Sequence, residues 1–124
     1  MRRVPECLDA EVLARIKRQR SEAFLAGLIG LFLEEGPVRL REAWDGGKSR
    51  DWRRTAVATH ILCCLADNIG ALAVRDLAIQ AEAACAGKPG AVSDLPRILF
   101  DLEIAFAETR SCLDCARSGS SGPA

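Results

Sequence analysis

The stretch that decides the fold is THILCCLADNIGA, residues 59–71, which carries the only histidine of the chain, His60. A helix turns by about 100° per residue, so the position of each side chain around its axis follows from its number. Four apolar residues fall within roughly 40° of the direction opposite His60: Ala58, Leu62, Leu65 and Ile69. Because such an apolar stripe faces the core of a protein, we expect the imidazole of His60 to point into solvent, where a partner protein can reach it.

The solvent side of this helix carries a second set of residues, which surround the histidine. Within about 60° of His60 around the axis lie Arg53, Ala56, Cys63, Cys64 and Asp67. A neutral imidazole is a competent nucleophile near neutral pH. His60 is therefore the candidate reactive group, and these five residues are its candidate surroundings.

The composition fits one small domain. The chain has 124 residues, of which 49% are hydrophobic, enough for a core of its own. Its 17 basic and 17 acidic residues cancel, which gives no electrostatic argument for binding nucleic acid. No run of about 18 uncharged apolar residues is present, so we expect no membrane span. No apolar segment of a secretion signal follows Arg2 and Arg3 either.

Six cysteines are spread over the chain: Cys7, Cys63, Cys64, Cys85, Cys112 and Cys115. An even number would allow a disulfide framework, but these residues fall within helical patterns of a chain too large and too apolar to need cross-links. We therefore expect reduced thiols and a cytoplasmic location.

Apolar periodicity and capping residues predict a series of helices. Asp9 is suited to cap a helix over 10–19, and Ser21 to cap a helix over 22–35. The remaining expected elements, in chain order, are a turn over 45–49, a helix over 50–69 that Ser49 caps and Gly70 ends, a helix over 71–86, a turn over 87–90, a helix from the cap Ser93 to about Cys115, and a flexible tail over 118–124.

The Gly36-Pro37 pair interrupts this series in a way that the sequence leaves open. Pro37 either begins a further helix that ends near Trp44 or bends one long helix. Two sets of apolar residues are expected to face inward further along the chain: Leu72, Leu77, Ala78, Ala81 and Cys85 on the helix over 71–86, and Leu95, Ile98, Leu99, Leu102, Ile104, Phe106 and Leu113 on the last helix.

The predicted fold class is all-α. Short connections between successive long helices favour antiparallel neighbours, so we expect an up-down antiparallel four-helix bundle with a short additional N-terminal helix. The expected organisation is an N-terminal segment over 1–7, the helical bundle over 8–116 and a flexible tail over 117–124.

The residues around His60 also form a recognisable motif. Leu62 follows two positions after the histidine, and Asn68-Ile69-Gly70-Ala71 closes the run; the segments 24–40, 51–56 and 77–82 flank it in a fixed order. In order and spacing, these pieces resemble the histidine-containing phosphotransfer (HPt) domains of multistep two-component signalling, over roughly residues 8 to 113. The resemblance identifies His60 with the phosphoacceptor histidine of that family.

The resemblance implies a function for the chain. It would exchange a phosphoryl group between His60 and the aspartate of a response-regulator receiver domain, and a hybrid sensor histidine kinase is a further implied partner. It would not be an enzyme on its own, because the receiver supplies the aspartyl phosphate and the Mg²⁺, so no cofactor is expected in this chain. No nucleic acid or membrane partner is implied.

Two residues depart from the motif of this family. Cys63 stands where the family has a lysine that helps to balance the phosphoryl charge, and Cys64 stands where it has a glycine that leaves room for the receiver. A thiol does neither. Arg53 is then the candidate cation, although seven residues separate it from His60, about 10 Å along a helix. Asp67 would either repel a phosphoryl group or hydrogen-bond the ring.

Two alternatives follow from these departures. The chain is either a degenerate HPt that binds a receiver or kinase without phosphotransfer, or a cysteine-based metal or redox sensor. The second would combine His60 and Cys63 with the C-x-x-C pair Cys112 and Cys115. In an up-down bundle that pair would lie about 15 Å along the axis from His60, which argues against a shared metal site.

Overall fold

The computed structural model describes residues 8–87 and 91–119. Its elements are α1 (Ala10–Gln19), α2 (Glu22–Lys48), α3 (Trp52–Asn68), α4 (Leu72–Ala84), the 3-10 helix η2 (Ala91–Asp94) and α5 (Leu95–Gly119). The described part of the chain is helical and holds no strand, which confirms the all-α class. The expected segment 1–7, most of the expected turn over 87–90 and residues 120–124 of the expected tail lie outside the described residues.

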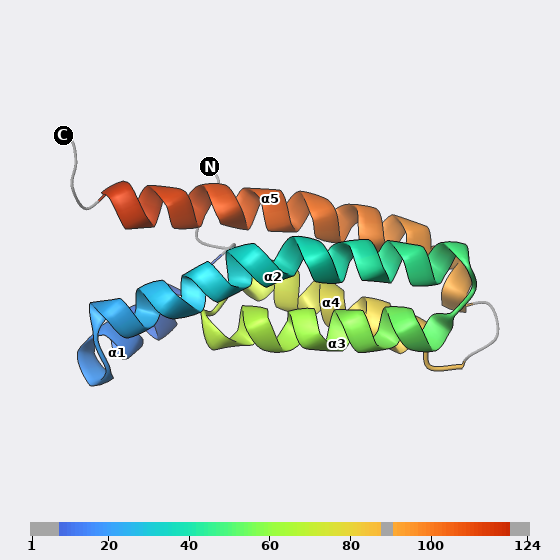
Figure 1. Cartoon of the computed structure of the whole chain (residues 1–124), viewed down its shortest axis with the longest axis horizontal. Helices are drawn as coiled ribbons and strands as arrows, with labels where there is room; N and C mark the ends of the chain where they lie inside the picture. Colours follow the sequence, from blue (N-terminus) through green and yellow to red (C-terminus); the bar gives the residue numbers. More distant parts are fainter. Residues whose placement is uncertain (1–7, 88–90, 120–124) are drawn as a thin grey trace.

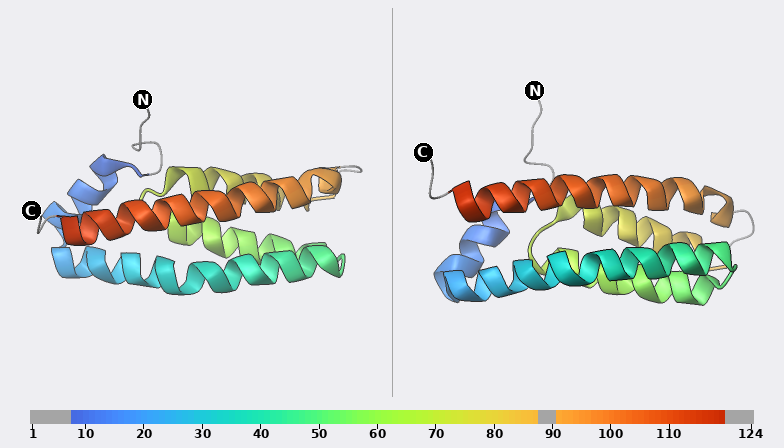
Figure 2. Two further views of the ribbon diagram at one scale, coloured as in Figure 1. Left: turned by 90° about the horizontal axis from the view of Figure 1, so that it is seen from above. Right: turned by 45° about the horizontal axis from the view of Figure 1, so that its top comes forward.

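The helices pack against one another around one core. Figure 1 shows α2, α3, α4 and α5 side by side, with the chain direction reversing from each helix to the next. Each of these helices contacts the following one, and α5 also contacts α2, so the four surround a common interior. The short helix α1 lies obliquely at the end of the molecule where α2 begins and α5 ends (Figure 2).

All four long helices supply the core. Its largest fully buried apolar side chains are Phe32, Leu62, Ile69, Leu95, Leu99, Leu102, Leu113 and Val74. Phe32 of α2 and Phe106 of α5 are in ring contact, with centroids 4.9 Å apart. One detail of the expected core was wrong, since Ile104 is 44% exposed. Leu77 and Cys85 are half-buried and pack against the core as expected, Leu72 is half-buried, and Val74, which the expected set did not include, is fully buried.

The caps expected for the first two helices are confirmed. The Asp9 carboxylate accepts a hydrogen bond from the Glu11 amide at 3.0 Å, and the Ser21 hydroxyl accepts one from the Phe24 amide at 2.9 Å. These are the first-turn amides that have no partner within the helix itself. The Asp9 amide also donates to the Gly70 carbonyl at 2.8 Å, which ties α1 to the α3–α4 connection.

Of the two readings left open at Pro37, the structure has one long helix, α2, with Pro37 inside it. The turn expected over 45–49 was wrong, because α2 continues to Lys48. Two of the glycines of α2, Gly36 and Gly46, allow close packing between helices. A Cβ on Gly36 would run into the Phe106 ring, and one on Gly46 would run into the Thr55 hydroxyl. Tertiary contact therefore keeps this segment helical despite the low helix propensity of glycine.

The cap expected at Ser49 was also wrong. Ser49 ends α2, and its hydroxyl donates to the Asp45 carbonyl at 2.9 Å. The N-cap of α3 is Asp51, whose carboxylate accepts from the Arg54 amide at 3.2 Å. Between them, Arg50 adopts a left-handed conformation with φ of 60°.

The ends of α2 and α3 have the same hydrogen-bonded geometry. After α2, the amides of Arg50 and Asp51 donate to the Gly47 and Gly46 carbonyls, at 3.3 and 2.8 Å. After α3, the amides of Gly70 and Ala71 donate to the Asp67 and Ala66 carbonyls, at 3.2 and 2.9 Å. Both ends are Schellman motifs, which require one residue with positive φ. As expected, Gly70 fills that place after α3, with φ of 71°.

The last helix differs from the expectation at both ends. Ser93 lies within η2, and α5 begins at Leu95 with Pro96 in its first turn, where a missing amide costs no hydrogen bond. The tail expected over 117–124 was wrong for residues 117–119, because α5 runs to Gly119. Within the ranges described, none of the helices combines the length and the apolar character that crossing a membrane requires.

Candidate functional site

Helix α3 is fixed against its neighbours by the side opposite His60. The buried Thr55 hydroxyl donates to the Ala43 carbonyl of α2 at 2.8 Å. The buried Thr59 hydroxyl donates within α3, to the Thr55 carbonyl at 2.9 Å. These bonds satisfy polar groups that would otherwise be costly in a core. The bond from Thr55 to α2, together with the buried apolar residues of α3, fixes the rotation of α3 about its axis.

The outward orientation predicted for His60 is confirmed. Its side chain is 62% exposed, while Ala58, Leu62 and Ile69 on the opposite side of the helix are buried and Leu65 is half-buried. His60 lies near the middle of α3, between helix ends that are both capped. The structure therefore presents the imidazole to solvent from a firmly held helix.

The immediate partner of His60 is Glu82, on α4. The His60 Nδ1 and Glu82 Oε1 atoms are 3.2 Å apart, and the Glu82 side chain is itself 41% exposed. When Nδ1 carries the proton of the neutral ring, it donates to the carboxylate, and Nε2 keeps its lone pair. Nε2 has no hydrogen-bond partner among the described residues. The arrangement orients the ring and leaves one nitrogen free to act as a nucleophile.

The two cysteines after His60 differ in their surroundings. Cys63 is half-buried and Cys64 is exposed. Burial raises the pKa of the Cys63 thiol, and the neighbouring Cys64, Asp67 and Glu82 raise it further. Cys63 is therefore a neutral thiol at neutral pH and supplies no positive charge at the position where the HPt motif has lysine.

Asp67 is not directed at the imidazole. Its carboxylate lies 3.6 Å from the Arg75 guanidinium of α4, and Arg75 also binds Asp76 at 3.0 Å. The hydrogen bonds to Asp76, followed by the nearby charges of Asp76 and Asp67, raise the pKa of Arg75 above its already high ordinary value, so the guanidinium stays charged. The negative charge of Asp67 is thus offset by a cation on the same side of the molecule as His60.

Arg53 and Ala56 complete the set predicted around His60. Ala56 is half-buried and Arg53 is exposed. Arg53 lines a shallow hollow of about 360 Å³ between α2 and α3, together with Glu42, Asp51, Arg54 and Val57; we call this the α2–α3 hollow. Arg53 therefore lies in the first turn of α3. The residue that contacts the imidazole is Glu82 and not Arg53.

Exposed apolar side chains lie beside the α2–α3 hollow. Val57 of α3 is 50% exposed and Val38 of α2 is 40% exposed. Val38 is one turn before Glu42, so both residues are on the α3 side of α2. Val57 is one turn before His60 on α3. Exposed apolar side chains close to a reactive group are typical of a docking surface.

The described cysteines do not assemble into a metal site. All five described cysteines are free, and Cys7 lies outside the described residues. Within residues 8–87 and 91–119, no three histidine, cysteine, aspartate or glutamate side chains converge as metal ligands. Burial also raises the pKa of Cys85, which disfavours the thiolate that metal binding and redox chemistry require. The described thiols thus give no support to a metal or redox sensor.

Sequence reasoning missed Glu82 and Arg75 as parts of the site. His60 and Glu82 are 22 residues apart and lie on opposite sides of the Gly70 turn. In an antiparallel helix pair, residues at similar distances before and after the turn come side by side. His60 and Glu82 are separated from Gly70 by similar numbers of residues, one before the turn and one after it, so this rule places them side by side. By the same rule, Asp67 lies next to the first turn of α4, which includes Arg75.

Comparison of the chain with protein-family models, with curated proteins and with solved structures finds no match.

Proposed function

We propose that this chain is an HPt module in which His60 exchanges a phosphoryl group with the aspartate of a receiver domain. The observation that carries the proposal is the state of the imidazole: it is 62% exposed, and its Nδ1 lies 3.2 Å from a carboxylate. An HPt module needs a nucleophilic nitrogen that a partner can reach, and this ring has one.

In the proposed reaction, the Nε2 lone pair of His60 attacks the phosphorus of an aspartyl phosphate. The N–P bond forms, the P–O bond to the aspartate breaks, and the carboxylate of the receiver leaves with the bonding electrons. The Nδ1 proton stays in the hydrogen bond to Glu82, where the carboxylate stabilises the positive charge that develops on the ring. Glu82 acts here as a positioning residue, and the receiver contributes the Mg²⁺.

The fold that we propose is the up-down four-helix bundle of this family, formed by α2 to α5, with α1 as an added helix. Support comes from the reversal of direction between successive helices and from the contacts of α5 with both α4 and α2. In such a bundle, a receiver would approach the side of α3 that carries His60. Val57 and Val38 supply apolar contact there, while the exposed Arg53 offers a positive charge to an acidic partner.

The partner chemistry also suggests where the protein acts. Receiver domains and the kinase domains that phosphorylate them work in the cytoplasm, and free thiols are expected in that compartment. We therefore propose a cytoplasmic protein whose partners are a receiver domain, a hybrid sensor histidine kinase, or both.

One observation favours a second candidate function, that of a degenerate HPt that binds a receiver without taking its phosphate. Cys63 and Cys64 replace the lysine and glycine of the motif, and the raised pKa of Cys63 leaves that position uncharged. Phosphorylation adds close to two negative charges to the histidine. Without a cation one turn away, the product is less stabilised and transfer is slower.

Phosphorylation assays separate the two candidates. The chain is incubated with a receiver that acetyl phosphate and Mg²⁺ have phosphorylated, and in parallel with phosphoramidate as a small phosphoryl donor. A phosphate-affinity gel then measures modification. We expect a shifted band that acid treatment removes and that His60→Gln abolishes. Receiver binding without a shifted band supports the degenerate HPt, and a shift that persists in His60→Gln refutes the proposal.

Glu82→Gln tests the role of the carboxylate. Loss of the charge should slow phosphorylation by phosphoramidate about fivefold, which corresponds to about 1 kcal/mol; this lies below the usual value for a charged hydrogen bond because both side chains are partly exposed. Glu108→Gln, an exposed carboxylate on α5, is the matched control and should leave the rate unchanged. Equal rates for the two variants would remove Glu82 from the mechanism.

A further inference from the structure

A groove runs between α2 and α5. It has a volume of about 700 Å³, within the range of small-molecule sites. His60 and Glu82 belong to the two other long helices, α3 and α4. The groove is therefore separate from the proposed phosphotransfer site. We call it the α2–α5 groove.

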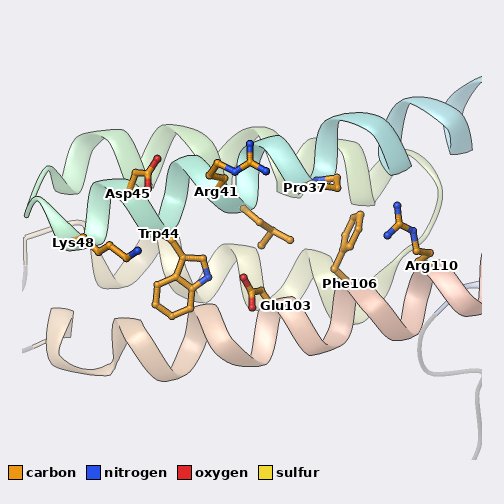
Figure 3. Close-up of a pocket in the computed structure, with 9 residues that line it drawn as sticks. Pro37, Arg41, Trp44, Asp45, Lys48, Glu103, Phe106 and Arg110 are labelled. Atoms are coloured by element: carbon orange, nitrogen blue, oxygen red, sulfur yellow. The ribbon is translucent and has the colours of Figure 1, made fainter.

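The floor of the α2–α5 groove is apolar and aromatic. Leu40 and Trp44 of α2 and Phe106 of α5 line it, and Phe106 is held in place by its contact with Phe32 in the core. Figure 3 shows the indole of Trp44 and the ring of Phe106 along the opening between the two helices. Such a surface favours a ligand with a flat apolar part.

Three cations border this apolar floor. Arg41 and Lys48 come from α2 and Arg110 from α5. In Figure 3, Lys48 and Arg110 lie toward opposite ends of the groove. None of the three forms an ion pair with a described residue; Arg110 instead lies 5.9 Å from the centre of the Phe106 ring. Of the two carboxylates in the lining, Asp45 is already paired with Arg54. The other carboxylate, on the exposed Glu103 of α5, lies beside the Trp44 indole in Figure 3 and forms no ion pair with a described residue. The lining therefore offers a ligand three positive charges against one unpaired negative charge.

The Trp44 indole gives a second and independent indication. Its Nε1 atom is buried and has no hydrogen-bond partner within residues 8–87 and 91–119. Buried donors are nearly always paired, since leaving one unpaired is costly. In Figure 3 the indole nitrogen is on the edge of the ring that faces along the groove. A ligand that brings an acceptor oxygen to this point would satisfy the donor.

From these observations we infer that the α2–α5 groove binds a small organic anion: a flat apolar body with a carboxylate, sulfonate or phosphate group. The apolar body lies against Leu40, Trp44 and Phe106. The anionic group accepts a hydrogen bond from Trp44 Nε1 and a charge-assisted contact from Arg41, Lys48 or Arg110. The size of the groove limits the ligand to one small molecule, and the site does not depend on the proposed phosphotransfer.

The probe for this site is 8-anilinonaphthalene-1-sulfonate, which combines aromatic rings with one sulfonate. Its fluorescence, titrated against the folded full chain, should show saturable binding to one site. N-phenyl-1-naphthylamine, which has the same rings without the sulfonate, should bind about tenfold more weakly, the loss expected for a charge-assisted contact. The chain has only two tryptophans, so ¹⁵N NMR resolves the Trp44 indole N–H, which should shift on binding.

Three variants decide the result. Trp44→Phe keeps a ring but removes the donor, and Arg110→Gln removes one charge from an exposed position; each should weaken binding of the sulfonate probe about five- to tenfold. Arg97→Gln, an exposed arginine of α5 that pairs with Asp101 and does not line the groove, should leave it unchanged. Circular dichroism melts verify that each variant is folded. Absence of saturable binding, equal binding of the uncharged probe, or binding that neither Trp44→Phe nor Arg110→Gln weakens would overturn the inference.

Discussion

The close approach of α2 and α3 at Gly46 makes a quantitative prediction. A Cβ at this position would overlap the Thr55 hydroxyl and would lie 2.8 Å from the Thr55 nitrogen and 2.9 Å from the Asp51 oxygen. The last two are backbone atoms, so in Gly46→Ala the start of α3 has to move. Overpacking of this kind costs about 1–3 kcal/mol, and loss of the hydrogen bond from Thr55 to Ala43 adds about 1 kcal/mol.

The better helix propensity of alanine offsets about 1 kcal/mol of this cost, so Gly46→Ala should lose about 2 kcal/mol of unfolding free energy. Gly30→Ala on the same helix is the control. Nothing lies within 4 Å of a Cβ at Gly30, and this variant should gain about 1 kcal/mol. Urea unfolding followed by circular dichroism measures both, and their melting temperatures should differ by on the order of 10 °C. If the two variants were equally stable, the close packing of α2 on α3 at Gly46 would be refuted.

Three further predictions concern the ends of α3 and the thiols. Arg50→Gly should raise the unfolding free energy by about 1 kcal/mol, because a residue other than glycine pays for its left-handed conformation; unchanged stability in urea would contradict this. Asp51→Ala should lower the unfolding free energy by about 1 kcal/mol through loss of the N-cap. An unchanged unfolding free energy would show that Asp51 does not cap α3. In alkylation by iodoacetamide, followed by tandem mass spectrometry, Cys63 should react more slowly than the exposed Cys64. Because its pKa is raised, the pH at which its alkylation rate is half-maximal should lie above about 8.5, the ordinary thiol value; a half-maximal rate at or below that pH would show a normal or activated thiol.

Features set by local sequence could be predicted. The direction of His60 follows from the apolar pattern of its own helix, and the caps Asp9 and Ser21 act within three residues of themselves. Gly70 ends α3 because positive φ is a property of one residue. Each of these depends on a stretch of chain that the sequence displays directly.

Features set by packing between helices could not be predicted in the same way. Gly46 and its neighbour Gly47 resemble a turn, and only the approach of Thr55 shows why they are helical. Ser49 and Asp51 are both good caps, and the choice between them follows from where α2 ends. The partner of His60 is on another helix, so the register of α3 against α4 had to be known before Glu82 could be identified.

In the proposed phosphotransfer, the hydrogen bond between His60 and Glu82 would also select between two chemical products. An imidazole has two nitrogens, and attachment of a phosphoryl group to each gives a different isomer of phosphohistidine. The Glu82 carboxylate occupies Nδ1, at 3.2 Å, and repels any anionic donor that approaches it, much as a protecting group does in synthesis. If His60 is phosphorylated as proposed, this geometry would direct the phosphoryl group to Nε2, and ³¹P NMR of the modified chain should show the Nε2 isomer alone.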